Sequence, residues 1–284
     1  GLNLTAEGSV GNTQNATEIN VHGEKLNISA KNDIYVNEVD AASGKTDIGT
    51  VASENGNVTL TTAQDTVIDS LFSANGNISL KTAQDTEIGS MKAENGAGMV
   101  ETAGNLTIAE LTVKTADMTA AGTLEIAEII ADSLKAVAGE LLKVATSKDL
   151  HAELLQAKRV EAEAAGEIDE LLTGHAKLTA GGKADVTTSG DLSAGTIEAA
   201  NIHLKAAGDL GTREEALMLK TGDRVEAEAG GLINIRETST ESGKTTITAK
   251  SDKDDVTVET NRDLVLEDTQ GQNVNVTTGG RLEA

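Results

Sequence analysis

The chain has 284 residues, and its 46 acidic and 23 basic side chains give a formal net charge of −23. It contains no cysteine, proline or tryptophan, and Tyr35 and Phe72 are its only aromatic residues. This composition excludes a disulfide scaffold, a thiolate metal site and a cysteine nucleophile. It also argues against nucleic-acid binding, which needs clustered basic side chains and stacking aromatics. No run of 18 apolar residues is present, so we expect no membrane insertion by this segment.

Two consecutive segments, residues 53–72 and 73–92, are identical at 12 of 20 positions. A fainter pattern extends this repeat, in which an isoleucine at position i is followed by another apolar residue at i+3. The pattern begins at Ile48, Ile68, Ile88, Ile108 and Ile126, so its step is constant as far as Ile108 and then shortens slightly. Such a period predicts one coil turn per repeat, with the first four isoleucines in one inward column. Apolar residues at i and i+3 predict a corner between two strands, because a straight strand would repeat at i+2.

Short triplets such as Val58–Leu60 and Val256–Val258 place two apolar side chains on one face, and Gly, Asn or Asp separates them. These features predict an all-β fold: a right-handed single-stranded parallel β-helix, or solenoid, of about 18–20 residues per turn. We expect about 14–16 turns, a narrow core of Ala, Val, Ile and Leu, and a single domain over residues 1–284. We also expect the chain to be a fragment of a longer surface protein.

Residues 122–172 are the exception, because they are rich in the helix formers Ala, Glu, Leu and Lys. A helix is the competing interpretation, because its apolar stripe could be formed by Ile126, Ile129, Ile130, Val137 and Leu141. The Gly-x-Leu/Ile frame nevertheless continues through this stretch at Gly122, Gly139 and Gly166. We therefore expect the coil to continue here.

The stretch from Gly190 to Leu210 opens and closes on Gly-Asp-Leu and alternates Ile, Leu and Ala between them. Residues 55–60 and 75–80 carry related Asn-Gly-Asn-x-x-Leu units. These motifs resemble the haemagglutinin-type repeat of bacterial filamentous adhesins, including the leukotoxin-family filamentous adhesins, and the resemblance covers most of the chain. It implies the repetitive β-helical shaft of a large, extracellular bacterial surface adhesin.

The residues that could carry chemistry are scattered. The four histidines are His22, His151, His175 and His203. No metal-binding spacing links them, and we expect all four at the surface without partners. Asp252–Asp255 has the charge density of a calcium loop but lacks the glycine and distal glutamate of an EF-hand, so a solvated turn is expected. The acids Glu161, Glu163, Glu214 and Glu215 are expected to be exposed. We therefore predict no catalytic, cofactor-binding or metal-ligating residues and no cofactor.

These observations favour a structural and adhesive shaft segment without catalysis, monomeric as a fragment. Its expected partner is a receptor, protein or glycan, on a host or neighbouring cell. Binding contacts are expected in the least repetitive stretches, Gly8–Glu18 and Glu237–Lys244. The alternative is a β-helical polysaccharide lyase or hydrolase, which would need paired carboxylates and usually aromatic platforms for sugar rings. The shortage of aromatics and the acidic surface argue against that alternative.

Overall fold

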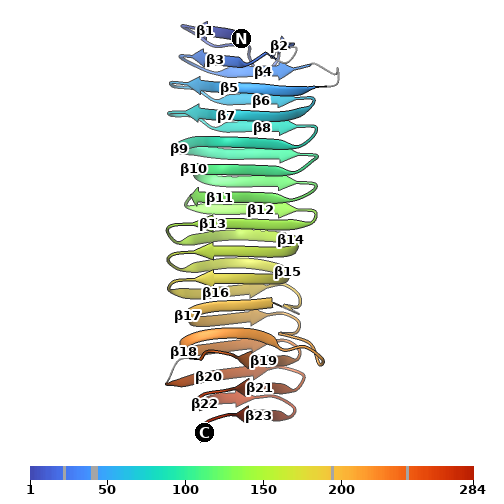
Figure 1. Cartoon of the computed structure of the whole chain (residues 1–284), viewed down its shortest axis with the longest axis vertical. Coiled ribbons are helices and arrows are strands. Elements are labelled where there is room, and N and C mark those ends of the chain that lie inside the picture. Colours follow the sequence, from blue (N-terminus) through green and yellow to red (C-terminus); the bar gives the residue numbers. More distant parts are fainter. Residues whose placement is uncertain (22–23, 40–43, 193–194, 241–242) are drawn as a thin grey trace. The chain divides into compact units, whose positions relative to one another are not determined.

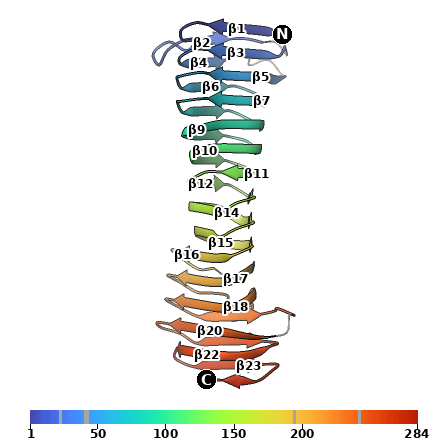
Figure 2. The same cartoon turned by 90° about the vertical axis from the view of Figure 1, so that its left-hand side faces the viewer.

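The computed structural model describes residues 1–284 except 22–23, 40–43, 193–194 and 241–242, and only the backbone of residues 169–176. All regular secondary structure in this described part is β-strand, paired in parallel as the turns of a β-solenoid (Figure 1). A view from the side shows the same stacking of strands within each half of the chain (Figure 2). The predicted all-β parallel β-helix is confirmed.

The chain divides into two compact units, Gly1–Ala145 and Thr146–Ala284. The first unit contains β1 (Leu2–Ala6), β2 (Thr17–Ile19), β3 (Leu26–Ala30), β4 (Ile34–Glu38), β5 (Lys45–Ser53), β6 (Val58–Thr62), β7 (Asp65–Ser73), β8 (Ile78–Thr82), β9 (Thr86–Thr102), β10 (Leu106–Ala120), β11 (Leu124–Ile130), β12 (Ser133–Ala138) and all but the last residue of β13 (Leu141–Thr146). The second contains β14 (Leu150–Ala164), β15 (Ile168–Ala180), β16 (Lys183–Thr188), β17 (Gly195–Ala206), β18 (Leu217–Ala229), β19 (Ile233–Glu237), β20 (Lys244–Ser251), β21 (Val256–Thr260), β22 (Asp263–Gln270), β23 (Val274–Thr278) and β24 (Leu282–Glu283). The expectation of a single domain stays a prediction.

The helical alternative for residues 122–172 is wrong, because this stretch forms strands β11 to β15. Its inward side chains continue columns that begin earlier in the chain: Ile126 pairs with Ile108, and Ile129 pairs with Leu111. Both isoleucines are almost completely buried. Helix propensity amounts to a few tenths of a kcal/mol per residue, and burial of one large apolar side chain contributes about 2 kcal/mol. Tertiary burial therefore decides the structure of this stretch.

One coil turn consists of three short segments in which buried and outward residues alternate. In the turn formed by β7 and β8, the alternation shifts between Ile68 and Leu71, which are both buried. This shift is the corner that the i, i+3 spacing predicts. A second corner, built from a Ser-x-Asn-Gly-Asn bend, separates Ser73 from Ile78. Each segment contributes two or three side chains to a core only a few residues wide, which suits aliphatic side chains.

The isoleucine column forms as predicted. Ile48 pairs with Ile68, Ile68 with Ile88, and Ile88 with Ile108. All four side chains are at most 1% exposed. The two units together make about 13 turns, slightly fewer than expected. The reason is that some turns are longer than the repeat predicts, as the pairing of Ile34 with Val58 and of Ile233 with Val256 shows.

Asn and Asp side chains connect successive coil turns at the bends. The Oδ1 atom of each accepts a hydrogen bond from the backbone N–H of the equivalent residue one turn later. Asn57 accepts from the N–H of Asn77 at 2.9 Å, and Asp191 accepts from the N–H of Asp209 at 2.8 Å. Further members of this Asx ladder are Asp33, Asn77, Asp85, Asn105, Asp149, Asp209 and Asp263. These bonds satisfy bend N–H groups that no strand partner reaches.

Several of the glycines that open a new turn make room for this ladder. A Cβ atom on Gly208 would overlap Oδ1 of Asp191, and one on Gly166 would overlap Oδ1 of Asp149. Gly190 differs because nothing lies within 4 Å of the position that its Cβ would take. A glycine at this position therefore reflects a contact between turns, because its missing side chain leaves room for the Asx of the turn before it.

The core is less purely aliphatic than expected, because buried hydroxyl and carboxyl groups line one corner of the first unit. Oγ1 of Thr62 lies 2.6 Å from Oγ1 of Thr66, and one turn later the Thr82 and Thr86 hydroxyls lie 2.5 Å apart. Glu38, only 2% exposed, accepts a hydrogen bond from Thr46 at 3.0 Å. In an alternating pattern threonine is expected to be an outward polar residue, and here pairing between two inward threonines offsets the cost of burial.

Replacement of Ile88 by aspartate should destabilise the fold severely, by at least about 4 kcal/mol, because it buries a carboxylate with no partner. Asp85→Asn is the control, since asparagine retains the Oδ1 atom that accepts the N–H of Asn105 at 2.7 Å. Its expected effect is within about 0.5 kcal/mol. Chemical denaturation of both variants measures the difference, and equal midpoints would refute the inward assignment of Ile88.

Gly208→Ala should cost about 1–3 kcal/mol, because the new methyl group overlaps the Asp191 carboxylate in the previous turn. Gly190→Ala, in the same sequence motif, should be neutral or slightly stabilising, since its Cβ meets open space and alanine lowers the entropy of the unfolded chain. Urea unfolding of the two variants tests this. A similar loss of stability in both would mean that backbone flexibility, and not the Asx contact, explains the motif.

Candidate functional site

Charged side chains of the second unit form columns on one outward face, across successive strands. Asp185 on β16 pairs in register with His203 on β17, and His203 pairs with Glu226 on β18. Nδ1 of His203 lies 2.8 Å from Oδ1 of Asp185, and Nζ of Lys183 donates to Oδ2 of the same carboxylate at 2.7 Å. All four residues are half-buried. The spacing of the turns therefore places a histidine between two carboxylates.

This arrangement shifts two pKa values. Partial burial alone would raise the pKa of Asp185, but hydrogen bonds from Lys183 and His203 outweigh it and hold the pKa below its ordinary value of 3.8. A hydrogen bond from Arg224 lowers the pKa of Glu226. Both carboxylates therefore remain ionised at neutral pH. An aspartate that orients a histidine is one half of a general-base arrangement, and in the described part of the chain no hydroxyl is hydrogen-bonded to His203.

The prediction that all four histidines lack partners is wrong for His203, which pairs with Asp185. The signal was present in the sequence, because the two residues stand one repeat apart, at the spacing that also separates Gly190 from Gly208. His151 is exposed on β14, as expected. The predictions for His22 and for the side chain of His175 lie outside the described residues.

The acidic segment Asp252–Asp255 lies in a bend, as expected, but two of its carboxylates, those of Asp254 and Asp255, are engaged. The guanidinium of Arg213 donates to both oxygens of Asp254 at 2.8 Å. The backbone N–H of Asp255 and Arg213 hold the pKa of Asp254 below its usual range. Asp255 accepts the side-chain amide of Asn273 at 2.7 Å. Among the described residues, no cluster of three or more His, Asp or Glu side chains has a geometry that could hold a metal ion.

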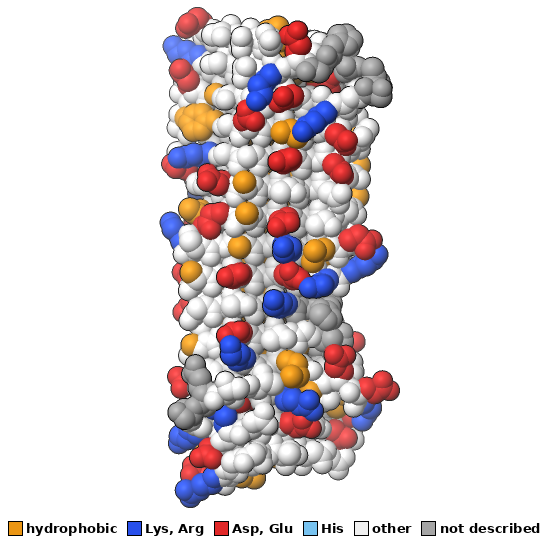
Figure 3. Space-filling view, in the orientation of Figure 1, with side chains coloured by type: hydrophobic (Ala, Val, Ile, Leu, Met, Phe, Trp, Pro, Cys, Tyr) orange, Lys and Arg blue, Asp and Glu red, His pale blue; other side chains and the backbone are white. Residues whose placement is uncertain are grey.

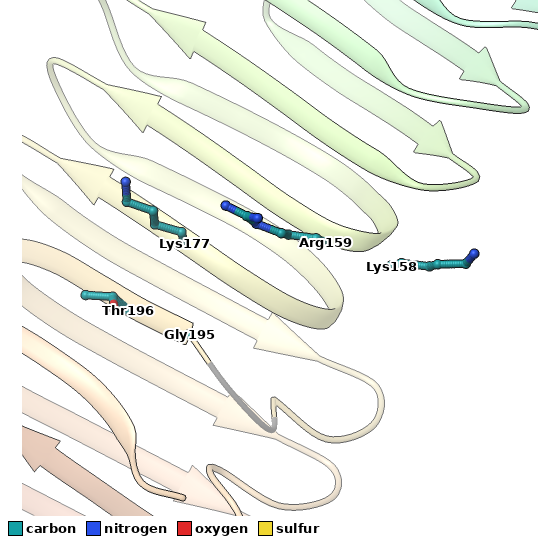
Figure 4. A pocket seen from close by; sticks show the side chains of 5 residues that line it. All are labelled: Lys158, Arg159, Lys177, Gly195 and Thr196. Carbon is teal, nitrogen blue, oxygen red and sulfur yellow. The ribbon is translucent and has the colours of Figure 1, made fainter.

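Two of the recesses that described residues line are in the second unit. One, of about 440 Å³, is lined by Lys158, Arg159, Lys177, Gly195 and Thr196. Arg159 and Lys177 lie on one side of it, whereas Lys158 points away from both (Figure 4). Arg159 pairs with Glu161, which is half-buried and not the free surface acid expected. The recess therefore offers one charge-compensated guanidinium and one ammonium, a weak attraction for an anion.

The other recess is a groove of about 490 Å³ that crosses several turns. Small residues make up most of its lining, which also includes Glu163, Glu198 and Lys220. Glu198 accepts a hydrogen bond from Lys220 at 2.5 Å. Glu163 is exposed, as expected. Acidic and basic side chains are interspersed on the molecular face that Figure 3 shows.

The stretch Gly8–Glu18 forms a short polar loop after Gly11, whose φ is +68°. The Asn12 side chain closes the loop by accepting the N–H groups of Gln14 and Asn15, both at 2.9 Å. The second unit contains the same loop after Gly211. The φ of Gly211 is +75°, and the Thr212 hydroxyl accepts the N–H of Glu215 at 2.9 Å. Glu214 and Glu215 are exposed in this loop, as expected.

The stretch Glu237–Lys244 also has a counterpart, at Glu38–Lys45. Glu237 is 1% exposed and accepts hydrogen bonds from the N–H of Ser239 and the hydroxyl of Thr260, both at 2.8 Å. Its counterpart Glu38 is likewise buried, and a Ser-Gly-Lys-Thr sequence follows each glutamate. Residues 40–43 and 241–242, within these stretches, lie outside the described part. Each stretch that we expected to be least repetitive therefore has a counterpart in the other unit. For the second stretch, the sequence already indicated this likeness through its two Ser-Gly-Lys-Thr segments.

Acid should selectively weaken the contacts that the Asp185 carboxylate makes with Lys183 and His203. Because the pKa of Asp185 is lowered in the folded state, its contribution is complete above about pH 4 and is lost as the pH falls through the folded pKa. Urea midpoints of the parent protein and Asp185→Asn should therefore differ near pH 6 and differ less near pH 3. His151→Gln, at an exposed position, is the control and should have no effect. The same difference at both pH values would contradict the assignment.

No helix in the described residues is long and apolar enough to cross a membrane. No protein-family model matches the chain, and neither a curated protein nor a solved structure matches it. A proposal for its function therefore rests on the sequence motifs and the geometry of the chain itself.

Proposed function

We propose that this segment is a structural and adhesive shaft of a secreted bacterial filamentous adhesin and that it catalyses no reaction. The observation that carries the proposal is the continuity of stacking within each unit: strand ladders, aliphatic columns and the Asx ladder all repeat from turn to turn. Such a structure resists local opening, because every turn is held by both neighbours. A stiff, acidic, extracellular spacer is the role that these properties suit best.

The adhesive contacts belong to two equivalent lateral loops, one after Gly11 in the first unit and one after Gly211 in the second. These loops lie outside the strands. Their backbone is fixed by hydrogen bonds from loop N–H groups to the side chains of Asn12 and Thr212. A rigid base with exposed polar side chains is the usual design of a recognition loop. The partner is a receptor, protein or glycan, on a host or neighbouring cell, and the fragment itself acts as a monomer.

A β-helical polysaccharide-active enzyme is the second candidate, because one groove presents Glu163 and Glu198 on two turns that are separated by the turn of Thr179. Glycoside hydrolysis uses two carboxylates, one of them protonated when the reaction begins. The carboxylate of Glu198 is engaged in an ion pair with Lys220, whose Nζ lies 2.5 Å from Oε1. The Asp185–His203 pair belongs to another outward column and is not part of this groove.

Beads coated with the purified fragment should attach to receptor-bearing cells, and uncoated beads should not. The double variant Gln14→Ala/Glu214→Ala should reduce attachment without changing the unfolding midpoint, because both side chains are exposed at the loop tips. Glu101→Ala, on the outward face of β9, is the matched control. Failure of the coated beads to attach would refute the adhesive role. Depolymerisation of a polysaccharide that Glu198→Gln abolishes would establish the enzyme instead.

Removal of metal ions should leave the fold unchanged, since stability is attributed to ladders and core packing. Addition of EDTA should therefore not shift the thermal midpoint, because only a metal bound to the native state raises it. A decrease of several degrees would point to a metal site, and Asp254→Asn in the presence of calcium would then test the acidic bend.

A further inference from the structure

The sequence contains three Asn-Gly pairs, and they occupy equivalent positions in consecutive turns of the first unit: Asn55-Gly56, Asn75-Gly76 and Asn95-Gly96. All three asparagines are exposed. The carboxamide carbon of an asparagine can be attacked by the backbone nitrogen of the next residue, and a glycine at that position offers no side chain to hinder the attack. The same local sequence in three turns isolates the effect of the surroundings.

In the first two pairs the glycine nitrogen is held by a buried serine. The N–H of Gly56 donates to Oγ of Ser53 at 2.9 Å, and the N–H of Gly76 donates to Oγ of Ser73 at 2.8 Å. Both serines are at most 1% exposed, and their hydroxyls in turn donate to backbone carbonyls one turn earlier. Attack by either nitrogen must first break a hydrogen bond in a buried network.

The third pair lacks this restraint. In the ladder between β7 and β9, Phe72 pairs with Lys92, which places Ala93 at the position of Ser73. Alanine offers no hydroxyl to the N–H of Gly96. The local backbone differs as well, because residues 54–56 and 74–76 form bends, whereas residues 94–96 lie within strand β9.

Asn95 also stands at the end of the asparagine column. Oδ1 of Asn55 accepts the side-chain amide of Asn75 at 3.4 Å, from the following turn. Beyond Asn95 the turn shortens: Ala93 pairs with Val113 and Ala97 with Thr115, so three residues face the single residue Lys114. This irregularity is a β-bulge, in which extra residues escape regular pairing. The next turn therefore supplies no asparagine to cover Asn95.

We propose that Asn95 is a site of spontaneous deamidation, whereas Asn55 and Asn75 are protected by Ser53 and Ser73. The Gly96 nitrogen forms a bond to Cγ of Asn95, the Cγ–Nδ2 bond breaks, and ammonia leaves with the proton of the Gly96 N–H. Water then opens the succinimide at one of its two carbonyls and yields aspartate or isoaspartate. The product places a new carboxylate beside the Lys92–Glu94 ion pair, whose charged atoms lie 2.8 Å apart.

Incubation of the folded protein at 37 °C and mildly alkaline pH, followed by peptide mapping by mass spectrometry, measures deamidation at each asparagine. Asn95 should react about fivefold faster than Asn55 or Asn75, the factor expected for the loss of one hydrogen bond. In denaturing urea the three rates should become similar. Equal rates in the folded protein would overturn the proposal.

Two reciprocal substitutions assign the effect to the serine. Ala93→Ser should slow deamidation of Asn95 to the rate at the other two sites, and Ser73→Ala should accelerate deamidation of Asn75 about fivefold. Thermal midpoints establish that each variant is folded. If Ser73→Ala does not fold, Ala93→Ser decides alone, and an unchanged rate at Asn95 in that variant would refute the role of the hydroxyl.

Discussion

The spacing of parallel strands, about 4.8 Å from one turn to the next, is the constraint on which the rest of this structure depends. A side chain on one turn has its equivalent on the next within contact distance, so every inward position becomes a column. Ile48, Ile68 and Ile88 form such a column, and their close packing stabilises residues that are far apart in sequence. The same spacing explains why like residues recur: a side chain that fits beside its neighbour in one turn fits in the next.

This constraint made much of the fold predictable. The constant step of the isoleucine pattern can be satisfied only if those residues stack, and the i, i+3 spacing identifies the corner between Ile68 and Leu71. The pattern also overrides local propensity, since residues 122–172 consist largely of helix formers and nevertheless form strands. The periodicity is informative here because it shows which side chains are buried. Burial of these side chains contributes more free energy than helix propensity does.

The polar features were harder to predict because their partners lie one turn away. His203 is isolated in the sequence, and only the register between successive turns brings it to Asp185. The threonines at Thr62 and Thr66 follow an ordinary alternating pattern, and nothing in that pattern indicates that both hydroxyls point inward and bind each other. The likeness of the two lateral loops was missed because Gly11 and Gly211 are separated by many coil periods. The polar contacts therefore depend on which individual residues meet between turns, whereas the fold follows from the repeating pattern of apolar residues.

The contact between an Asx and the glycine of the following turn has a consequence for how such a chain can change. Asp191 fits against Gly208, so the two residues form an interlocking joint with a fixed direction along the coil. Any whole turn that presents a glycine at its entry and an Asx beside it can be inserted, removed or exchanged without disturbing its neighbours. Insertion or deletion of a few residues within a bend disrupts the contact between the Asx and the glycine, whereas insertion or deletion of one complete turn preserves it. The coil is therefore built to gain and lose length in units of one turn.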